Sequence, residues 1–177
     1  MAPMKMTRVG VLSDTHIASM SYGGAWLCAV VEKHFQGVAT ILHAGDIVDP
    51  DILLHLAPRN VLAVRGNLDP DLPELPHKRI IEVGDFRIGL VHGWGAPAGI
   101  VDRVLGEFAD DALDCLVFGH SHQPLCERRG NLLLFNPGSP TDRRASPFHS
   151  VGLLEIGAHI RGRIIRIPGP TQGDQHR

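Results

Sequence analysis

The stretch Arg8-Val9-Gly10-Val11-Leu12-Ser13-Asp14-Thr15-His16 joins a short apolar run to a polar turn. Near-continuous apolar character over the length of a strand predicts a strand that is buried on both faces. Four similar runs follow along the chain, at Val38–His43, Asn60–Arg65, Phe86–His92 and Leu113–Phe118. Each run leads into glycine, histidine or aspartate, so polar side chains collect where the predicted strands end.

Helical and hairpin patterns alternate with these strands. Apolar residues recur at helical spacing in two segments, and a proline at the start of a helix has a suitable φ angle. Helices are therefore expected at Ala25–Phe35, at Ala98–Ala109 and, as a shorter one, after Pro50. Glycine-containing turns between apolar runs predict hairpins, and these are expected over Ile80–Leu90, Leu125–Phe135 and Val151–Ile167. The chain is thus predicted to be an α/β protein in which hairpins extend a βαβ core into mixed sheets.

The composition is that of an ordinary globular domain. A length of 177 residues fits a single domain over 1–177, with a core at about 7–167 and a flexible tail at 168–177. A hydrophobic content of 44% and a net charge of −2 argue against a disordered chain, a general nucleic-acid binder and a polybasic membrane anchor. The chain has three cysteines without a CxxC motif and no long apolar segment, so a cytoplasmic protein is expected.

Side chains that can bind metals follow five of the predicted strands. In open α/β sheets, ligands bind at the carboxyl ends of the strands. The donors there are two aspartates, one asparagine and four histidines, namely Asp14, His16, Asp46, Asn67, His92, His120 and His122. Imidazole nitrogen together with carboxylate and amide oxygen suits zinc and divalent ions of the first transition row. Seven donors exceed the need of one tetrahedral site, and they suffice for two ions if one carboxylate is shared.

Three neighbours of these donors allow two interpretations each. Arg65 can contact a phosphate or be a solvated residue at a strand end. His43 can hydrogen-bond to the site from behind or be an ordinary buried histidine. Trp94 can form a wall of the pocket or only pack.

The motifs DTH (14–16), GD (45–46), GNLD (66–69), HG (92–93) and GHSH (119–122) occur in the order and at the spacing of a known family. The chain resembles the calcineurin-like metallophosphoesterase superfamily over about residues 7–167. Its length and the NPGS at 136–139 resemble the small single-domain phosphodiesterase branch, to which a retromer scaffold subunit is also related. The resemblance implies a four-layer α/β-β/α sandwich of two mixed β-sheets flanked by helices.

The resemblance also implies how the donors share two divalent ions, for which manganese, nickel, zinc and iron are all suitable. It assigns Asp14, His16 and His122 to the first ion, Asn67, His92 and His120 to the second, and Asp46 to both. It further implies in-line attack on phosphorus by a hydroxide that bridges the ions, with Asp46, His92 and Asp69 as catalytic side chains. A small phosphoester is the expected substrate, and a homo-oligomer is an open alternative to a monomer.

One position departs from the resemblance. Many members of the superfamily have a histidine after GN, thought to protonate the leaving group or to bind phosphate, and this chain has Leu68. Asp69, the usual partner of that histidine, is retained. Without that general acid, substrates with poor leaving groups should be affected most. The small phosphodiesterase branch often lacks this histidine, so the resemblance still favours a phosphodiesterase. The alternatives are a phosphomonoesterase or nucleotidase, and a non-catalytic scaffold that binds proteins.

Overall fold

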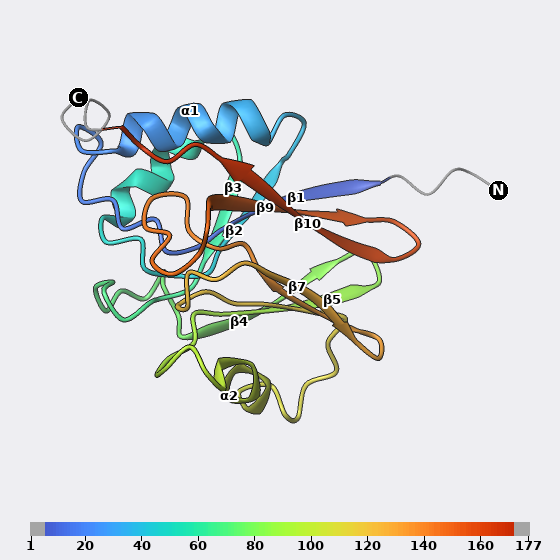
Figure 1. Ribbon diagram of the computed structural model, residues 1–177. Helices are drawn as coiled ribbons and strands as arrows, with labels where there is room; N and C mark the ends of the chain where they lie inside the picture. Colours follow the sequence, from blue (N-terminus) through green and yellow to red (C-terminus); the bar gives the residue numbers. More distant parts are fainter. Residues whose placement is uncertain (1–5, 172–177) are drawn as a thin grey trace.

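Two five-stranded sheets form the centre of the computed structural model, which describes residues 6–171 (Figure 1). The first sheet contains β1 (Thr7–Leu12), β2 (Thr40–His43), β3 (Asn60–Ala63), β9 (His149–Ile156) and β10 (Ile160–Ile167). The second contains β4 (Lys78–Val83), β5 (Phe86–Val91), β6 (Cys115–Val117), β7 (Leu125–Arg129) and β8 (Leu132–Asn136). The strand orders are β10-β9-β1-β2-β3 and β4-β5-β6-β8-β7. Both sheets are mixed, because β1–β2 and β5–β6 pair in parallel whereas β1–β9 and β4–β5 pair antiparallel.

Helices cover the outer face of each sheet. The helix α1 (Gly24–His34) and the 3₁₀ helix η1 (Pro50–Leu56) pack on the first sheet, and α2 (Ile100–Gly106) packs on the second. Figure 1 shows α1 at the top and α2 at the bottom, with the sheets between them. The predicted four-layer sandwich of two mixed sheets flanked by helices is confirmed.

The second long helix is shorter than predicted from its apolar spacing. The sequence pattern predicts a helix over Ala98–Ala109, whereas α2 spans Ile100–Gly106. Gly99 precedes it with φ 74°, outside the helical region, and 107–110 form a turn. Phe108 is nevertheless buried against the helical residues. Phe108 therefore continues the helical spacing of buried residues although it lies in a turn.

Aliphatic side chains of both sheets meet between them, and one aromatic ring fixes their spacing. Phe135 of β8 is fully buried, and its ring lies against Gly152 of β9 and Gly162 of β10. A Cβ atom at Gly152 would lie 2.5 Å from Cε1 of Phe135, and one at Gly162 would lie 2.6 Å from Cδ2. These two glycines therefore allow the first sheet to approach the second closely enough to bury the ring.

Replacing Gly152 by alanine should destabilise the protein, because the added methyl group would have to displace Phe135. Overpacking of this kind costs about 1–3 kcal/mol. Gly157→Ala is the matched control, since a Cβ atom there would have no neighbour within 4 Å among residues 6–171. Urea unfolding of both variants checks this expectation. Equal midpoints for Gly152→Ala and the wild type would show that Phe135 does not set the sheet spacing.

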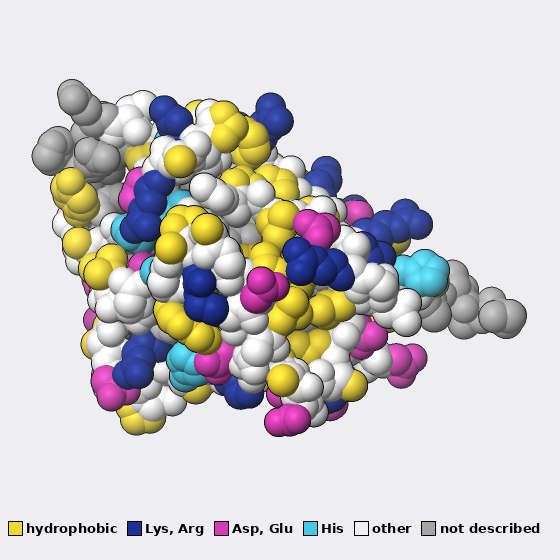
Figure 2. Space-filling model, turned by 60° about the horizontal axis from the view of Figure 1, so that its bottom comes forward, with side chains coloured by type: hydrophobic (Ala, Val, Ile, Leu, Met, Phe, Trp, Pro, Cys, Tyr) yellow, Lys and Arg dark blue, Asp and Glu magenta, His cyan; other side chains and the backbone are white. Residues whose placement is uncertain are grey.

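The surface and the ends of the chain add little to this description. In the view of Figure 2, Lys and Arg side chains are interspersed with Asp and Glu, and no broad patch of one sign covers this face. No helix formed by residues 6–171 is long and apolar enough to cross a membrane. Of the tail predicted at 168–177, residues 172–177 lie outside the described part of the chain.

Candidate metal centre

All seven predicted metal ligands lie in loops that follow parallel strands. Asp14 and His16 follow β1, Asp46 follows β2, Asn67 follows β3, His92 follows β5, and His120 and His122 follow β6. Parallel strands end on the same side of a sheet, and the two stacked sheets bring both sets of loops together. The structure thus places side chains that are more than a hundred residues apart in sequence at one edge.

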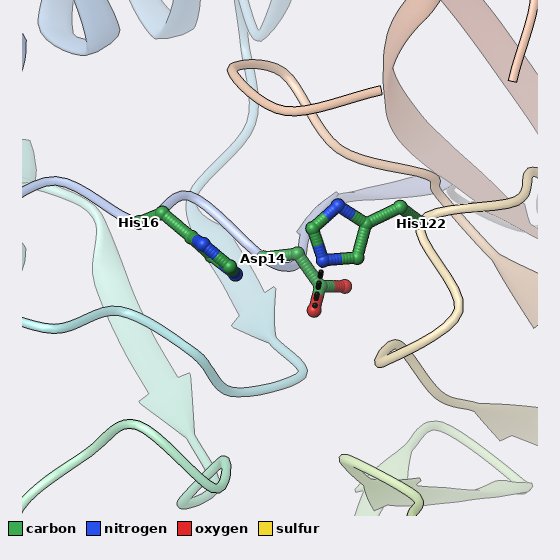
Figure 3. Close-up of side chains that lie close together, drawn as sticks. All are labelled: Asp14, His16 and His122. Atoms are coloured by element: carbon green, nitrogen blue, oxygen red, sulfur yellow. Dashed lines mark ion pairs between the residues drawn. The ribbon is translucent and has the colours of Figure 1, made fainter. Parts of the chain in front are cut away.

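The first cluster consists of Asp14, His16 and His122, each with one potential ligand atom within 4.8 Å of those of the other two. The Nε2 atom of His122 lies 3.3 Å from Oδ1 of Asp14. Figure 3 shows the His122 ring beside the Asp14 carboxylate, and His16 on the same loop as Asp14. Asp14 and His122 are fully buried, whereas His16 is partly exposed at the edge of this cluster.

Asp46 connects this cluster to a second one. Its Oδ2 atom lies 3.3 Å from Nε2 of His16, and its Oδ1 atom lies 3.4 Å from Nε2 of His92. Asp14, Asp46 and His92 likewise place one ligand atom each within 4.8 Å of one another. One carboxylate oxygen of Asp46 therefore faces each cluster, which is the arrangement that a shared ligand needs.

Asn67 and His120 complete the second cluster around His92. The Oδ1 atom of Asn67 lies 3.2 Å from Nε2 of His92 and 3.1 Å from Nδ1 of His120. The two ring nitrogens are 3.3 Å apart. The structure therefore brings together all the donors that the resemblance assigns to the second ion.

Backbone carbonyls determine which nitrogen of three histidines carries the proton. His92 donates through Nδ1 to the Ala44 carbonyl at 2.7 Å, and His120 donates through Nε2 to the Gly95 carbonyl at 2.8 Å. His122 donates through Nδ1 to the Asp142 carbonyl. A carbonyl can only accept, so the inward nitrogen of each neutral ring carries a lone pair. Such outer hydrogen bonds are the usual way in which proteins orient histidines that bind metals.

Buried atoms without partners test whether a cation fits this centre. Five buried side-chain atoms of the described residues make no hydrogen bond, and three of them are Asp14 Oδ1, His16 Nε2 and His122 Nε2; the other two, Arg59 Nε and His149 Nδ1, lie elsewhere. Leaving a buried polar atom unpaired costs about 1–3 kcal/mol. All three atoms belong to the first cluster, and the lone pairs of His92 and His120 face each other in the second. Divalent cations would satisfy both sets, so the residues fit the predicted metal ions.

The backbone at the centre is strained. Asp14, His16, Asp46, His120 and His122 have φ angles between 47° and 65°. These are five of the seven non-glycine residues with positive φ in the described chain. Each such residue costs on the order of 1–3 kcal/mol, and such strain concentrates at functional sites. The unusual backbone therefore supports a functional rather than a purely structural cluster.

Two motif glycines leave room for the carboxylates. A Cβ atom at Gly66 would lie 2.2 Å from Asp46 Oδ1, and one at Gly119 would lie 2.8 Å from Asp14 Oδ2. Neither position can hold a side chain without moving a predicted ligand. This close approach explains why glycine begins the GNLD and GHSH motifs.

The carboxylates and imidazoles shift one another's pKa values. Burial alone would raise the pKa of Asp46, but the neighbouring His16 and His92 lower it well below its usual range. Burial alone would lower the pKa values of His92 and His122, but contacts with Asp46 and Asp14, respectively, raise both above the ordinary histidine value. Without metal, the two histidines therefore hold their second proton to a higher pH than free histidine.

Divalent ions should consequently bind more weakly as the pH falls. Both raised histidine pKa values mean that protons compete with the metal near neutral pH and below it. We expect the dissociation constant for Mn²⁺ to rise as pH falls from about 8 to about 6, by up to about tenfold per pH unit for each proton displaced. Calorimetric titrations at several pH values, in buffers of different ionisation enthalpy, measure both the affinity and the protons released. A constant affinity without proton release would contradict the assigned ligands.

Asp69 has a structural task that the sequence does not reveal. Its Oδ1 atom accepts hydrogen bonds from the backbone N–H groups of Ile47 at 2.7 Å and Val48 at 2.8 Å. Its Oδ2 atom accepts from the N–H of Gly66 at 2.8 Å. The carboxylate thus ties the loop of Asp46 to the loop of Asn67, and a catalytic part for Asp69 stays a prediction.

His43 supports the site from behind. Its Nδ1 atom accepts a hydrogen bond from the Gly45 N–H at 3.2 Å, so Nε2 carries the proton and donates to the Thr15 hydroxyl at 3.1 Å. Burial lowers the pKa of His43 to about 4, which keeps the ring neutral. Of the two interpretations of His43, the structure favours a hydrogen bond that joins the loops of Asp14 and Asp46.

Further supporting hydrogen bonds come from the NPGS motif, which is expected to shape a turn near the site, and from Thr141 beyond it. The Ser139 hydroxyl donates to the Asp14 carbonyl at 2.7 Å, and the Thr141 hydroxyl donates to the Thr15 carbonyl at 2.6 Å. The hydrogen-bond acceptors of the histidines are backbone carbonyls, which every residue has, so no residue type in the sequence predicts them. Ser139 is the last residue of the NPGS motif, and Thr141 lies two residues beyond it.

Comparisons with known proteins agree with this geometry. The sequence profile of the calcineurin-like phosphoesterase superfamily domain matches residues 7–159. A probable metallophosphoesterase of Methanothermobacter thermautotrophicus is 38% identical over 168 residues, which cover 92% of this chain and 94% of that protein. The chain belongs to the calcineurin-like phosphoesterase superfamily.

Solved structures share the fold at lower identity. Vacuolar protein sorting 29 from Cryptosporidium parvum is similar with a TM-score of 0.70 and 21% identity, over 95% of this chain and 93% of that one. A structure described as a novel archaeal phosphodiesterase is similar with a TM-score of 0.66 and 19% identity, over 90% of this chain and all of that one (100%). At these identities the two structures support the fold.

Proposed function

We propose that the protein is a phosphodiesterase that requires two divalent metal ions. The observation that carries the proposal is the Asp46 carboxylate, with one oxygen toward His16 and the other toward His92. Membership of the metallophosphoesterase family and the relation to a structure described as a phosphodiesterase support it.

Asp14, His16 and His122 would hold the first ion, Asn67, His92 and His120 the second, and Asp46 both. When bound, a pair of ions in such a site generates a nucleophile from water at neutral pH and neutralises charge on phosphoryl oxygens. Asp46 would contribute negative charge to both ions. The outer hydrogen bonds of the histidines hold their rings in position, so little reorganisation is needed when substrate binds.

The cavity beside the centre favours diesters over monoesters. A cavity of about 430 Å³ is lined by Asn67 and His92 of the centre and by Arg65. Arg65 is the only lysine or arginine among the described residues that line it, and its guanidinium is paired with Asp71. The second negative charge of a monoester would therefore meet no unpaired basic side chain there. A diester carries a single negative charge and does not need one.

The natural partner is proposed to be a small phosphoester. Charges of both signs are interspersed on the face drawn in Figure 2, which does not favour a long nucleic acid. The three cysteines are free, which is consistent with our proposal of a cytoplasmic enzyme. A homo-oligomer stays a prediction.

Hydrolysis of bis(p-nitrophenyl) phosphate and p-nitrophenyl phosphate by the metal-loaded protein tests the proposal. We expect kcat/KM for the diester to exceed that for the monoester, because Arg65, the one basic side chain among the described residues that line the cavity, is already paired with Asp71. A preference for the monoester would favour the phosphatase alternative. Hydrolysis of neither compound by protein with bound metal would favour the scaffold.

The variant Asp46→Asn should lose most of the activity, because the amide keeps the shape but removes the charge that two cations share. We expect a loss of more than about 100-fold, beyond the ~10–100-fold effect of changing an outer hydrogen bond. Asp85→Asn, in the exposed β4–β5 turn, is the matched control and should behave as the wild type. Activity of Asp46→Asn within a few-fold of the control would show that the wrong carboxylate is assigned.

Leu68 gives a further prediction on the leaving group. Leu68 is 52% exposed and its side chain has no proton to donate, so rates should fall steeply as the leaving-group pKa rises. A general acid contributes typically ~10²–10⁴-fold. In Leu68→His, Asp69 retains an acceptor position that could orient the ring, since a carboxylate has about four such positions and three N–H groups of the described chain bind to it. We therefore expect the variant to hydrolyse alkyl esters faster than the wild type does. Its rates should also depend less steeply on the pKa of the leaving group.

A series of aryl and alkyl phosphodiesters measures this dependence, with Leu68→Gln as a control that is polar but cannot act as an acid. A flat dependence in the wild type would mean that another group already supplies the proton.

A further inference from the structure

An exposed tryptophan stands at the mouth of the metal centre. Trp94 is 40% exposed, although large aromatic side chains usually gain free energy from burial. It lines the cavity of about 430 Å³ together with Asn67 and His92 of the second cluster. The indole is therefore contiguous with the place where a phosphoester would bind.

The backbone that carries Trp94 is held firmly. Arg103 of α2 donates from Nε to the Trp94 carbonyl at 2.8 Å, and its other nitrogens donate to the carbonyls of Ala96 and Ala98. The next carbonyl, that of Gly95, accepts the hydrogen bond from His120 at 2.8 Å. A predicted ligand of the metal and the exposed indole are thus attached to the same short loop. This attachment presents the ring with little loss of backbone entropy on binding.

A second ring that lines the cavity lies next to Trp94. The ring centroid of His77 is 6.5 Å from that of Trp94, with the planes inclined by 46°. His77 is exposed over 57% of its side chain, and its Nε2 atom lies 3.2 Å from Oε2 of Glu107. The remaining lining side chains, such as Arg65 and Asp71, are polar or charged. A lipid tail would find one apolar side chain here, whereas a heteroaromatic ring would find ring faces and hydrogen-bonding groups.

We propose that Trp94 and His77 form a stacking subsite that selects phosphoesters with a planar heteroaromatic group, that is, substrates of the nucleotide class. The inference rests on the proposed function, because it takes the neighbouring metal centre as the place where the phosphate binds. The cavity volume falls within the range of small-ligand sites, and it has room for a base beside a phosphate. Stacking on an aromatic side chain accepts any base, so the subsite defines a substrate class and not one compound.

Calorimetry on the metal-loaded protein tests the subsite with two probes that carry the same phosphate, thymidine 5′-monophosphate and ribose 5-phosphate. Only the first has a base. We expect it to bind more tightly by about fivefold or more, the low end of what base stacking contributes. Trp94→Ala should bring the ratio of the two dissociation constants close to one, and Trp94→Phe should retain most of it. Trp26→Phe in α1, away from the cavity, should leave the ratio unchanged.

Equal binding of the two probes by the wild type, or an unchanged ratio in Trp94→Ala, would overturn the inference. Hydrolysis of bis(p-nitrophenyl) phosphate, measured on the same preparations, separates the two proposals. Hydrolysis without a preference for the base would refute the subsite and leave the phosphodiesterase standing. A preference for the base that depends on Trp94, without hydrolysis of the diester, would support the subsite and refute the phosphodiesterase.

Discussion

The inward lone pairs of the histidine rings are the constraint on which the rest of the structure depends. The backbone carbonyls of Ala44, Gly95 and Asp142 accept hydrogen bonds from the N–H groups of three histidine rings. The other nitrogen of each ring therefore faces the centre, where the carboxylates and the other rings lie. Facing lone pairs at 3.3 Å repel unless a proton or a cation lies between them. Two features of the loops maintain this arrangement. Several ligands have left-handed φ angles, and glycine occupies positions where the neighbouring carboxylate is too close for a side chain. Such an arrangement is costly for a structural cluster and suits a centre that holds cations.

Hydrogen bonds between neighbouring loops hold the strained residues of the centre in place. His43 joins the loops after β1 and β2, and Asp69 joins the loops after β2 and β3. The two sheets behind them are held close by the Phe135 ring on Gly152 and Gly162. The same loop that orients His120 presents Trp94 to the cavity, which links metal binding to the proposed recognition of a base.

Much of this could be predicted from the sequence because the chemistry follows the strands directly. Apolar runs with a polar end indicate a strand and a polar side chain at its end together, so the strands and the convergence of the seven predicted ligands at one edge were predictable. The end of α2 was not predictable, because Phe108 lies in a turn but is buried at the position where a longer helix would also bury it. The carbonyl partners of the histidines were also hidden, since any residue supplies a carbonyl. Asp69 was predicted to be catalytic from a motif, whereas its hydrogen bonds to three N–H groups depend on how two loops meet in space.

Anomalous diffraction from crystals of the protein loaded with Mn²⁺ tests the central claim most directly. Two anomalous peaks are predicted, one on each side of the Asp46 carboxylate, the first beside Asp14, His16 and His122 and the second beside Asn67, His92 and His120. A single peak, or peaks away from Asp46 in fully loaded crystals, would contradict the shared carboxylate and with it the proposed two-ion chemistry.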